Sequence, residues 1–101
     1  MTNFRTFDLA VSFYKQAKGL RLPAHLTDQL LRAASSVALN LAEGRGRPTR
    51  RDQARFFGIA FASAKEVQAI LSLEVDSSDH VHSLADSLAA HIHQLRKACL
   101  S

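Results

Sequence analysis

Residues 40–55 read NLAEGRGRPTRRDQAR, and this stretch predicts the end of one helix, a tight connection and the start of the next. Gly44 fits the position just after a helix end, where glycine is common. Pro48 fits the connection, because proline cannot continue a helix. Thr49 and Asp52 have the spacing of a capping box, in which side chains satisfy the free N–H groups of the first helical turn. The stretch therefore predicts a helix–turn–helix unit.

Apolar residues at helical spacing extend this unit on both sides. The preceding helix begins near Pro23, and the following one runs to about Glu74. The stripe of the preceding helix is Leu26, Leu30, Ala33, Val37 and Leu41. Two further helices are predicted, at about residues 4–18, ending before Gly19, and after the turn at 75–79. The first has Phe7, Ala10 or Val11, Tyr14 and Ala17 at helical spacing.

The last helix has the most regular pattern. Its seam follows alternating steps of four and three residues, the repeat of bundle packing. The seam residues are Val81, Ala85, Leu88, Ile92, Leu95 and Cys99. Four helices with short connections predict an all-α fold, an antiparallel up-down-up-down four-helix bundle. We expect one domain covering residues 1–101.

Composition restricts the class of protein further. Hydrophobic residues make up 47% of the 101 residues, with only two prolines and four glycines, which favours a compact helical protein. The lone cysteine, Cys99, excludes an internal disulfide and every multi-cysteine metal site. The N-terminus has no apolar core of signal-peptide length, and no run approaches the roughly 18 apolar residues of a membrane span. We therefore expect a cytoplasmic protein with no membrane contact.

The positive charge of the chain is concentrated in one segment. Residues 45–55 hold five of the nine arginines and a single acid, whereas the remaining residues include eight basic and eight acidic ones. Up-down topology places this segment at the same end as both termini, so Arg5, Arg96 and Lys97 are expected nearby. The sequence predicts a bundle with one strongly basic end, which would attract an anionic partner.

Helix electrostatics explain the positions of some of these five arginines but not of others. Arg45 and Arg47 follow a helix end, where the negative end of the helix dipole favours cations. Arg50 and Arg51 fall in a first helical turn, where the dipole disfavours positive charge by about 0.3–1 kcal/mol each. A bound anion would explain them, since helix N-termini attract phosphate, and Arg55 continues the same face. A solvated charged face is the alternative.

Two segments indicate a homo-oligomer. FFGIAFASA (56–64) is apolar around the whole helix, which predicts burial on more than one side. AASSVA (33–38) offers small residues that permit close helix approach. An unusually deep core within a single chain is the alternative.

Two stretches of the sequence resemble a known family, the small four-helix-bundle proteins encoded in 23S rRNA intervening sequences. These stretches are LLRAASSVALNLAEGRGR and FFGIAFASAKEVQAIL. The accessory protein of diversity-generating retroelements is similar to this family. The pattern R-A-x-x-S-I-x-x-N-I-A-E-G-x-G-R is matched by Arg32, Ala33, Ser36, Asn40, Ala42, Glu43, Gly44, Gly46 and Arg47. Phe56, Ile59, Ala60, Ser63 and Glu66 match the second part. The sequence departs from the pattern at Val37, Leu41, Phe57 and Ala62. The resemblance covers about residues 30–73 and implies a ring-shaped assembly, a pentamer, with a basic surface able to bind nucleic acid.

Within this motif Arg32, Asn40, Glu43 and Gly44 are interpreted as structural. Asn40 lies near the apolar stripe and needs hydrogen-bond partners. Glu43 is a partner for Arg32, Arg47 or an arginine of a neighbouring subunit. Direct ligand contact or catalysis is the alternative for Asn40 and Glu43.

No catalytic, cofactor or metal site is predicted. The glycines at 44 and 46 lack the rest of a phosphate-binding loop, and the serines lack a neighbouring base. His82 and His93 share a helix face but lie about 16 Å apart along the axis.

The function predicted is that of a non-enzymatic nucleic-acid-binding or accessory protein that contacts RNA or DNA phosphates largely independently of sequence. The contacting residues would be Arg45, Arg47, Arg50, Arg51, Arg55, Arg96 and Lys97. The alternative is an oligomeric scaffold that docks an acidic protein partner.

Overall fold

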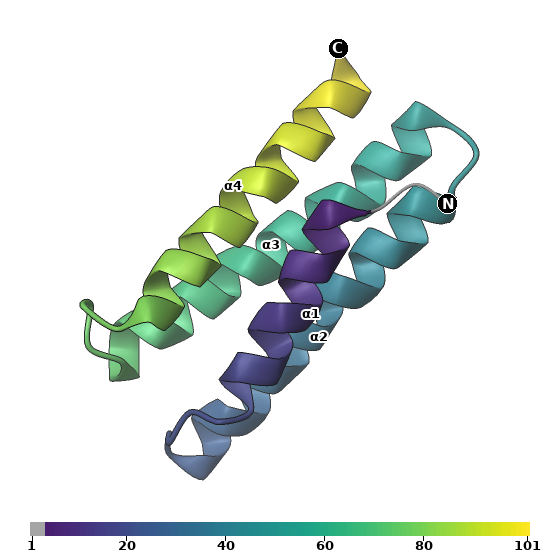
Figure 1. Ribbon diagram of the computed structural model, residues 1–101. Helices are drawn as coiled ribbons and strands as arrows, with labels where there is room; N and C mark the ends of the chain where they lie inside the picture. The colour runs from purple at the N-terminus through teal and green to yellow at the C-terminus, as the bar shows by residue number, and fades with distance from the viewer. Residues whose placement is uncertain (1–3) are drawn as a thin grey trace.

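The computed structural model describes residues 4–101, which form four α-helices. These are α1 (Arg5–Ala17), α2 (Ala24–Gly46), α3 (Arg50–Glu74) and α4 (His80–Leu100), and no strand occurs within residues 4–101. Figure 1 shows an antiparallel bundle in which α1 and α3 each pack against both α2 and α4. The predicted all-α four-helix bundle is therefore confirmed. The start of α1, the α2–α3 connection and the C-terminus lie at one end.

Side-chain N-caps stabilise the starts of α3 and α4, which lie where the sequence predicts. The Thr49 hydroxyl accepts a hydrogen bond from the Asp52 backbone N–H at 3.1 Å, which caps α3. Asp79 Oδ1 accepts one from the Val81 N–H at 2.9 Å, which caps α4. Only half of the predicted capping box forms, because the Asp52 carboxylate bonds arginines instead of the Thr49 N–H. Each N-terminus still gains a partner for an otherwise free donor.

The prediction that Gly44 follows the end of α2 is wrong. The helix continues through Gly46, and no glycine within residues 4–101 has a positive φ. The helix stops at Arg47, which is extended (φ −76°, ψ 145°). Pro48 causes this, because the residue before a proline is disfavoured in the helical region.

Gly44 instead allows α2 and α3 to approach each other closely. It is buried, and a Cβ on it would lie 2.7 Å from Phe57 Cε1 and 3.1 Å from Phe56 Cβ. Any larger residue would push the Phe57 ring, which is only 4% exposed, out of the core. The glycine is therefore a packing requirement at the end of the bundle that carries the arginines.

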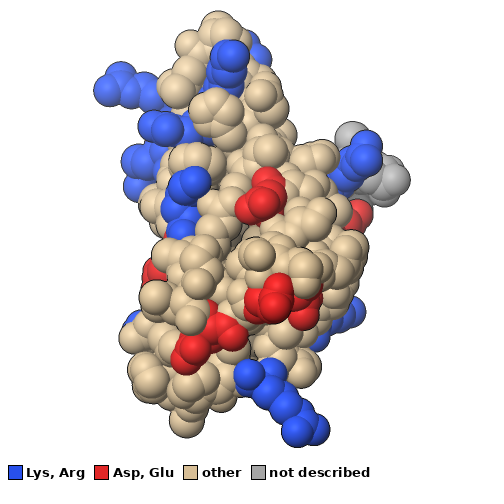
Figure 2. All heavy atoms as spheres, turned by 90° about the vertical axis from the view of Figure 1, so that its left-hand side faces the viewer, with Lys and Arg blue, Asp and Glu red and all other residues tan. Residues whose placement is uncertain are grey.

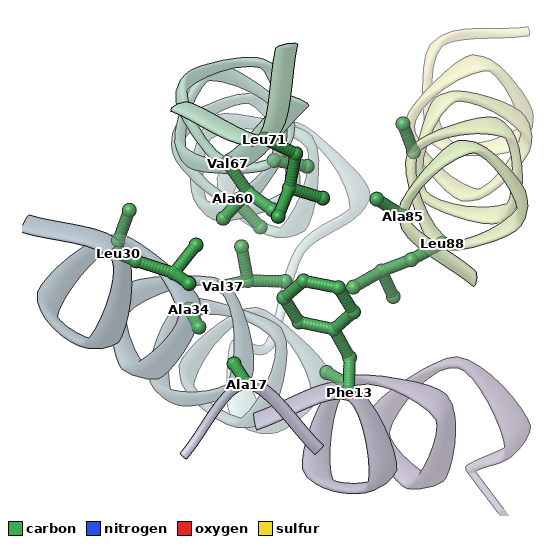
Figure 3. Packing of buried hydrophobic residues seen from close by; sticks show 14 of the residues in the cluster. Phe13, Ala17, Leu30, Ala34, Val37, Ala60, Val67, Leu71, Ala85 and Leu88 are labelled. Carbon is green, nitrogen blue, oxygen red and sulfur yellow. The ribbon is translucent and has the colours of Figure 1, made fainter. Parts of the chain in front are cut away.

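The apolar stripes of α2 and α4 are largely buried, and α3 adds a third buried face to the core. All five predicted stripe residues of α2 are buried, as are Val81, Ala85, Leu88 and Ile92 of α4, whereas Leu95 and Cys99 are half-buried. In α1 the buried face is rotated from the predicted one and consists of Thr6, Ala10, Phe13 and Ala17. Figure 3 shows Phe13 pointing from α1 toward Val37 and Leu88. Phe13 is 2% exposed and fills the centre, whereas Tyr14 is only half-buried.

The FFGIAFASA segment of α3 is only partly covered by its own chain. Phe57, Ala60 and Ala64 are buried, but Ile59 is 41% exposed and Ala62 is also exposed. The small residues at 33–38 are largely used within the chain: Ala33, Ala34 and Val37 are buried, and the Ser36 and Ser63 hydroxyls are 2.9 Å apart. By length and composition α3 meets the criteria for a membrane span, yet its buried face belongs to the bundle core.

Alanine substitutions at two glycines of the last turns of α2 test the close approach. Both Gly44→Ala and Gly46→Ala gain helix propensity, but only the first meets other atoms, since a Cβ at Gly46 has nothing within 4 Å. We expect Gly44→Ala to lower the free energy of unfolding by about 1–3 kcal/mol relative to Gly46→Ala, the usual cost of overpacking. Urea denaturation measures this difference. Equal stability of the two variants would contradict the packing role of Gly44.

Candidate nucleic-acid interface

Asp52 holds the connection between α2 and α3 together. Its Oδ2 accepts hydrogen bonds from Arg47 Nε at 3.2 Å and Nη2 at 3.1 Å. Its Oδ1 lies 3.6 Å from Arg55 Nε. Arg47 also donates from Nη1 to Glu43 Oε2 at 3.3 Å. One carboxylate thus links the residue after α2 to the second turn of α3.

These contacts change the titration of both partners. The hydrogen bonds from Arg47 lower the pKa of Asp52 below its ordinary value, and partial burial only partly opposes this effect. The same hydrogen bond raises the pKa of Arg47. Arg47 therefore stays charged, but two acids already satisfy much of its guanidinium. It is mainly a structural residue of the connection.

Arg50 has a structural partner that the sequence does not reveal. Its Nη2 donates a hydrogen bond to the Ala98 carbonyl at 3.0 Å. Ala98 lies in the last turn of α4, where carbonyls lack partners within the helix. A bound anion is therefore not needed to explain an arginine at position 50, because Arg50 ties the start of α3 to the end of α4.

Three other basic residues line a groove between α3 and α4, called the arginine groove here. Its main residues are Thr49, Arg51, Asp52, Arg55, Arg96 and Leu100. Arg51, Arg55 and Arg96 are all exposed, and Asp52 is the groove's only acid. Within residues 4–101, Arg51 forms no ion pair or hydrogen bond that would neutralise it. The structure thus brings together residues 45 positions apart in the sequence, as the topology predicts.

Gly58 creates the space in which Arg96 lies. A Cβ at this position would be 3.2 Å from Arg96 Nε and 3.7 Å from its Cζ. The guanidinium therefore rests against the backbone of α3, on the side that faces the groove. Sequence reasoning gave Gly58 no role, and only the three-dimensional arrangement reveals it.

Aromatic rings accompany the arginines at this end. The Arg55 guanidinium lies 4.4 Å from the centre of the Phe56 ring, and Arg47 lies 5.3 Å from it. Arg45 lies 4.6 Å from the centre of the Phe4 ring. Phe57 is in the core, whereas Phe56 is only half-buried. Phe4, which the sequence analysis did not select, is a functional candidate that local sequence patterns do not mark.

The motif residues have mainly structural surroundings. Asn40 is half-buried, and its amide donates to the Ser36 carbonyl at 2.9 Å and the Ser36 hydroxyl at 3.1 Å. Glu43 pairs with Arg47 rather than with Arg32, which is exposed. Lys97 is exposed in the last turn of α4. His82 lies 3.0 Å from the Val75 carbonyl, and His93 packs against the Phe61 ring at 5.7 Å.

The basic side chains are unevenly distributed along the bundle. Figure 2 shows several Lys and Arg side chains toward the upper end of one face, Asp and Glu side chains lower on it, and further Lys or Arg side chains at its lower end. The basic end holds the arginine groove and, beside it, Arg5, Arg45 and Arg50 around a second pocket. The two pockets thus place four of the five arginines of residues 45–55 at one end of the bundle, together with Arg5 and Arg96.

The fold and this surface define a small helical bundle with one arginine-rich end. The sequence profile of the 23S rRNA-intervening sequence proteins matches residues 4–101, and the chain belongs to this family. None of the curated proteins matches the chain significantly. A similar crystal structure is that of a protein of unknown function from the S23 ribosomal protein family of Bacteroides thetaiotaomicron. It has a TM-score of 0.63 and 20% identity, with 94% of each chain covered, and it supports the fold alone. The similarity to the retroelement accessory protein stays a prediction.

The Asp52 contacts predict a specific pH dependence of stability. Because the folded-state pKa of Asp52 is lowered, its stabilisation is complete above the unfolded value of about 3.9 and is lost as the pH falls through the folded value. Asp52→Asn should therefore lower Tm at neutral pH, and the gap to wild type should close in acid. Thermal unfolding followed by circular dichroism measures both effects.

Asp28→Asn is the matched control for this prediction. Asp28 is exposed on α2 and, within residues 4–101, makes no side-chain hydrogen bond or ion pair. Its substitution should leave Tm nearly unchanged at neutral pH. A gap between Asp52→Asn and wild type that persists undiminished in strong acid would show that the carboxylate charge is not the cause.

Proposed function

We propose that this chain is a non-enzymatic nucleic-acid-binding or accessory protein of the cytoplasm, whose basic end binds the phosphate backbone of RNA or DNA. The arginine groove carries the proposal, because three exposed guanidiniums line it and only one acid does. Like charges in one groove repel one another, and a bound polyanion relieves this repulsion. Affinity is also gained because the arginines release cations condensed on the nucleic acid. Membership of the family is consistent with this proposal.

The arginines of the basic end have different parts in this proposal. Arg51, Arg55 and Arg96 are the primary phosphate contacts, because they are exposed along one groove. Arg45, Arg47, Arg50 and Lys97 add to the field, and the first three also hold local structure. Contacts to phosphate carry no base information, so binding is largely independent of sequence.

The protein is further proposed to act as a homo-oligomer, with a pentamer favoured. Leu39 of α2 is 68% exposed and Ile59 of α3 is 41% exposed, and burial between copies would remove both from water. A ring would repeat the basic end and multiply its positive electrostatic potential.

Light scattering tests the oligomeric state. It should give a mass several times that of the 11.1 kDa chain, and Ile59→Glu should reduce this mass. Leu100→Glu, on α4, is the control, and a monomeric wild type would contradict this proposal.

Neutralising two groove arginines provides the test of binding. Arg51→Gln/Arg96→Gln removes two phosphate contacts but leaves the Asp52 contacts intact. The slope of log K against log salt should become shallower by about 1.4–1.8, since each phosphate contact contributes about 0.7–0.9. Fluorescence anisotropy with mixed-sequence RNA and DNA at several salt concentrations measures this slope.

Lys15→Gln/Arg21→Gln is the matched control because it removes the same net charge from the opposite end of the bundle. Its slope should stay close to that of wild type. If both double variants lose affinity equally, net charge rather than the arginine groove attracts the nucleic acid. If wild type binds neither RNA nor DNA at low salt, the proposed function is wrong, and an acidic protein becomes the partner to test.

A further inference from the structure

A second pocket opens at the basic end, on the other side of the first turn of α3. Its volume is about 420 Å³, and its lining includes Phe4, Arg5, Arg45, Arg50, Gln53 and Phe57. We call it the Phe4 pocket. Arg50 lines it, whereas the next residue, Arg51, lines the arginine groove. This separation follows from the rotation of about 100° between successive helical residues.

The chemistry of the Phe4 pocket differs from that of a simple phosphate site. The Phe4 ring is stacked against Phe7, with ring centres 6.3 Å apart, and tilted against Phe57 at the same distance. The Arg45 guanidinium lies over the Phe4 ring at 4.6 Å. Layered aromatic and guanidinium planes are the surfaces on which unstacked nucleobases stack. A plain phosphate would gain nothing from these rings.

Polar groups beside the rings complete a nucleotide-like environment. Arg5 is exposed and adds positive charge at the pocket. Gln53 donates from Nε2 to the Arg47 carbonyl at 3.3 Å, which fixes the orientation of its amide. Within residues 4–101, its Oε1 receives only the weak Cys99 thiol donor at 3.9 Å, so it retains capacity to accept from a base amino group. The volume lies within the range of small-molecule sites.

We infer that the Phe4 pocket binds one unstacked base of a single-stranded nucleic acid, so that the partner of the basic end is single-stranded. The inference rests on the proposed function and deepens it. A base in a duplex is paired and stacked on its neighbours, and its ring face is not available to Phe4 and Arg45. The adjacent arginine groove would hold the flanking phosphates.

The first experiment compares a short single-stranded oligonucleotide with a duplex of equal phosphate number at the same salt. Wild type should bind the single strand about tenfold more tightly, the effect of one stacked base. Phe4→Leu keeps an apolar side chain but removes the ring face, and should abolish this preference while leaving duplex affinity unchanged. Equal affinity of wild type for both ligands, or a preference that survives Phe4→Leu, would overturn the inference.

Phe61→Leu is the matched control. Phe61 is another half-buried ring with a cation over it, Lys65 at 5.9 Å, and it lies outside the Phe4 pocket. This variant should keep the full preference for the single strand. If Phe61→Leu loses the preference as fully as Phe4→Leu does, the Phe4 pocket is not its source.

The second experiment uses wild-type protein and small ligands, so it depends on neither variant folding nor polynucleotide binding. Adenosine monophosphate, titrated by NMR, should shift the backbone amides of Phe4, Arg5 and Gln53. Inorganic phosphate should shift them much less. Absent shifts with the nucleotide, or equal shifts with phosphate, would refute the base site even if oligonucleotides bind through the arginine groove. Shifts without any oligonucleotide binding would sustain the base site and reject the proposed function.

Discussion

The close approach of α2 and α3 at Gly44 is the constraint on which the basic end depends. Without a side chain at this position, the Phe57 ring packs directly against the α2 backbone. This contact brings the last turn of α2 beside the first turns of α3, and only a short connection through Pro48 is then needed. Arg47 and Asp52 owe their relative positions to that geometry, whereas the packing of α3 against α4 brings Arg96 beside Arg51 and Arg55.

Asp52 offsets part of the repulsion among the arginines at the basic end. It accepts from Arg47 and lies close to Arg55, and Arg50 is engaged by a carbonyl at the end of α4. Structural contacts therefore hold part of the cluster. Arg51 and Arg96 have no acidic partner within residues 4–101, so their repulsion is offset only by solvent, salt or a bound anion. This imbalance is the physical basis of the proposed binding surface.

The sequence was sufficient for features that depend on local periodicity. The first four seam residues of α4, the stripe of α2 and the Thr49 cap are confirmed, because spacing determines which residues share a face or a turn. The placement of Arg96 beside Arg51 also followed, since antiparallel topology brings those helix ends together. These inferences needed no knowledge of individual side-chain contacts.

Features that depend on contacts between distant residues could not be predicted. Gly44 carries a common end-of-helix signal, and only the position of Phe57 shows that it serves packing instead. Arg50 was interpreted as a phosphate ligand because its partner, Ala98, lies 48 residues away. Phe4 looked like an ordinary first-helix residue until the fold placed Arg45 over its ring. The burial of Phe13 rather than Tyr14 depends likewise on how α1 is rotated against its neighbours.

The central claim is that nucleic acid occupies the arginine groove, and chemical protection of arginines tests it most directly. The protein is treated with phenylglyoxal with and without bound RNA or DNA, and modification at each arginine is quantified by mass spectrometry. The account predicts that nucleic acid protects Arg51, Arg55 and Arg96 but leaves the exposed Arg21 and Arg32 as reactive as before. Unchanged reactivity of the three groove arginines in a saturated complex would contradict it.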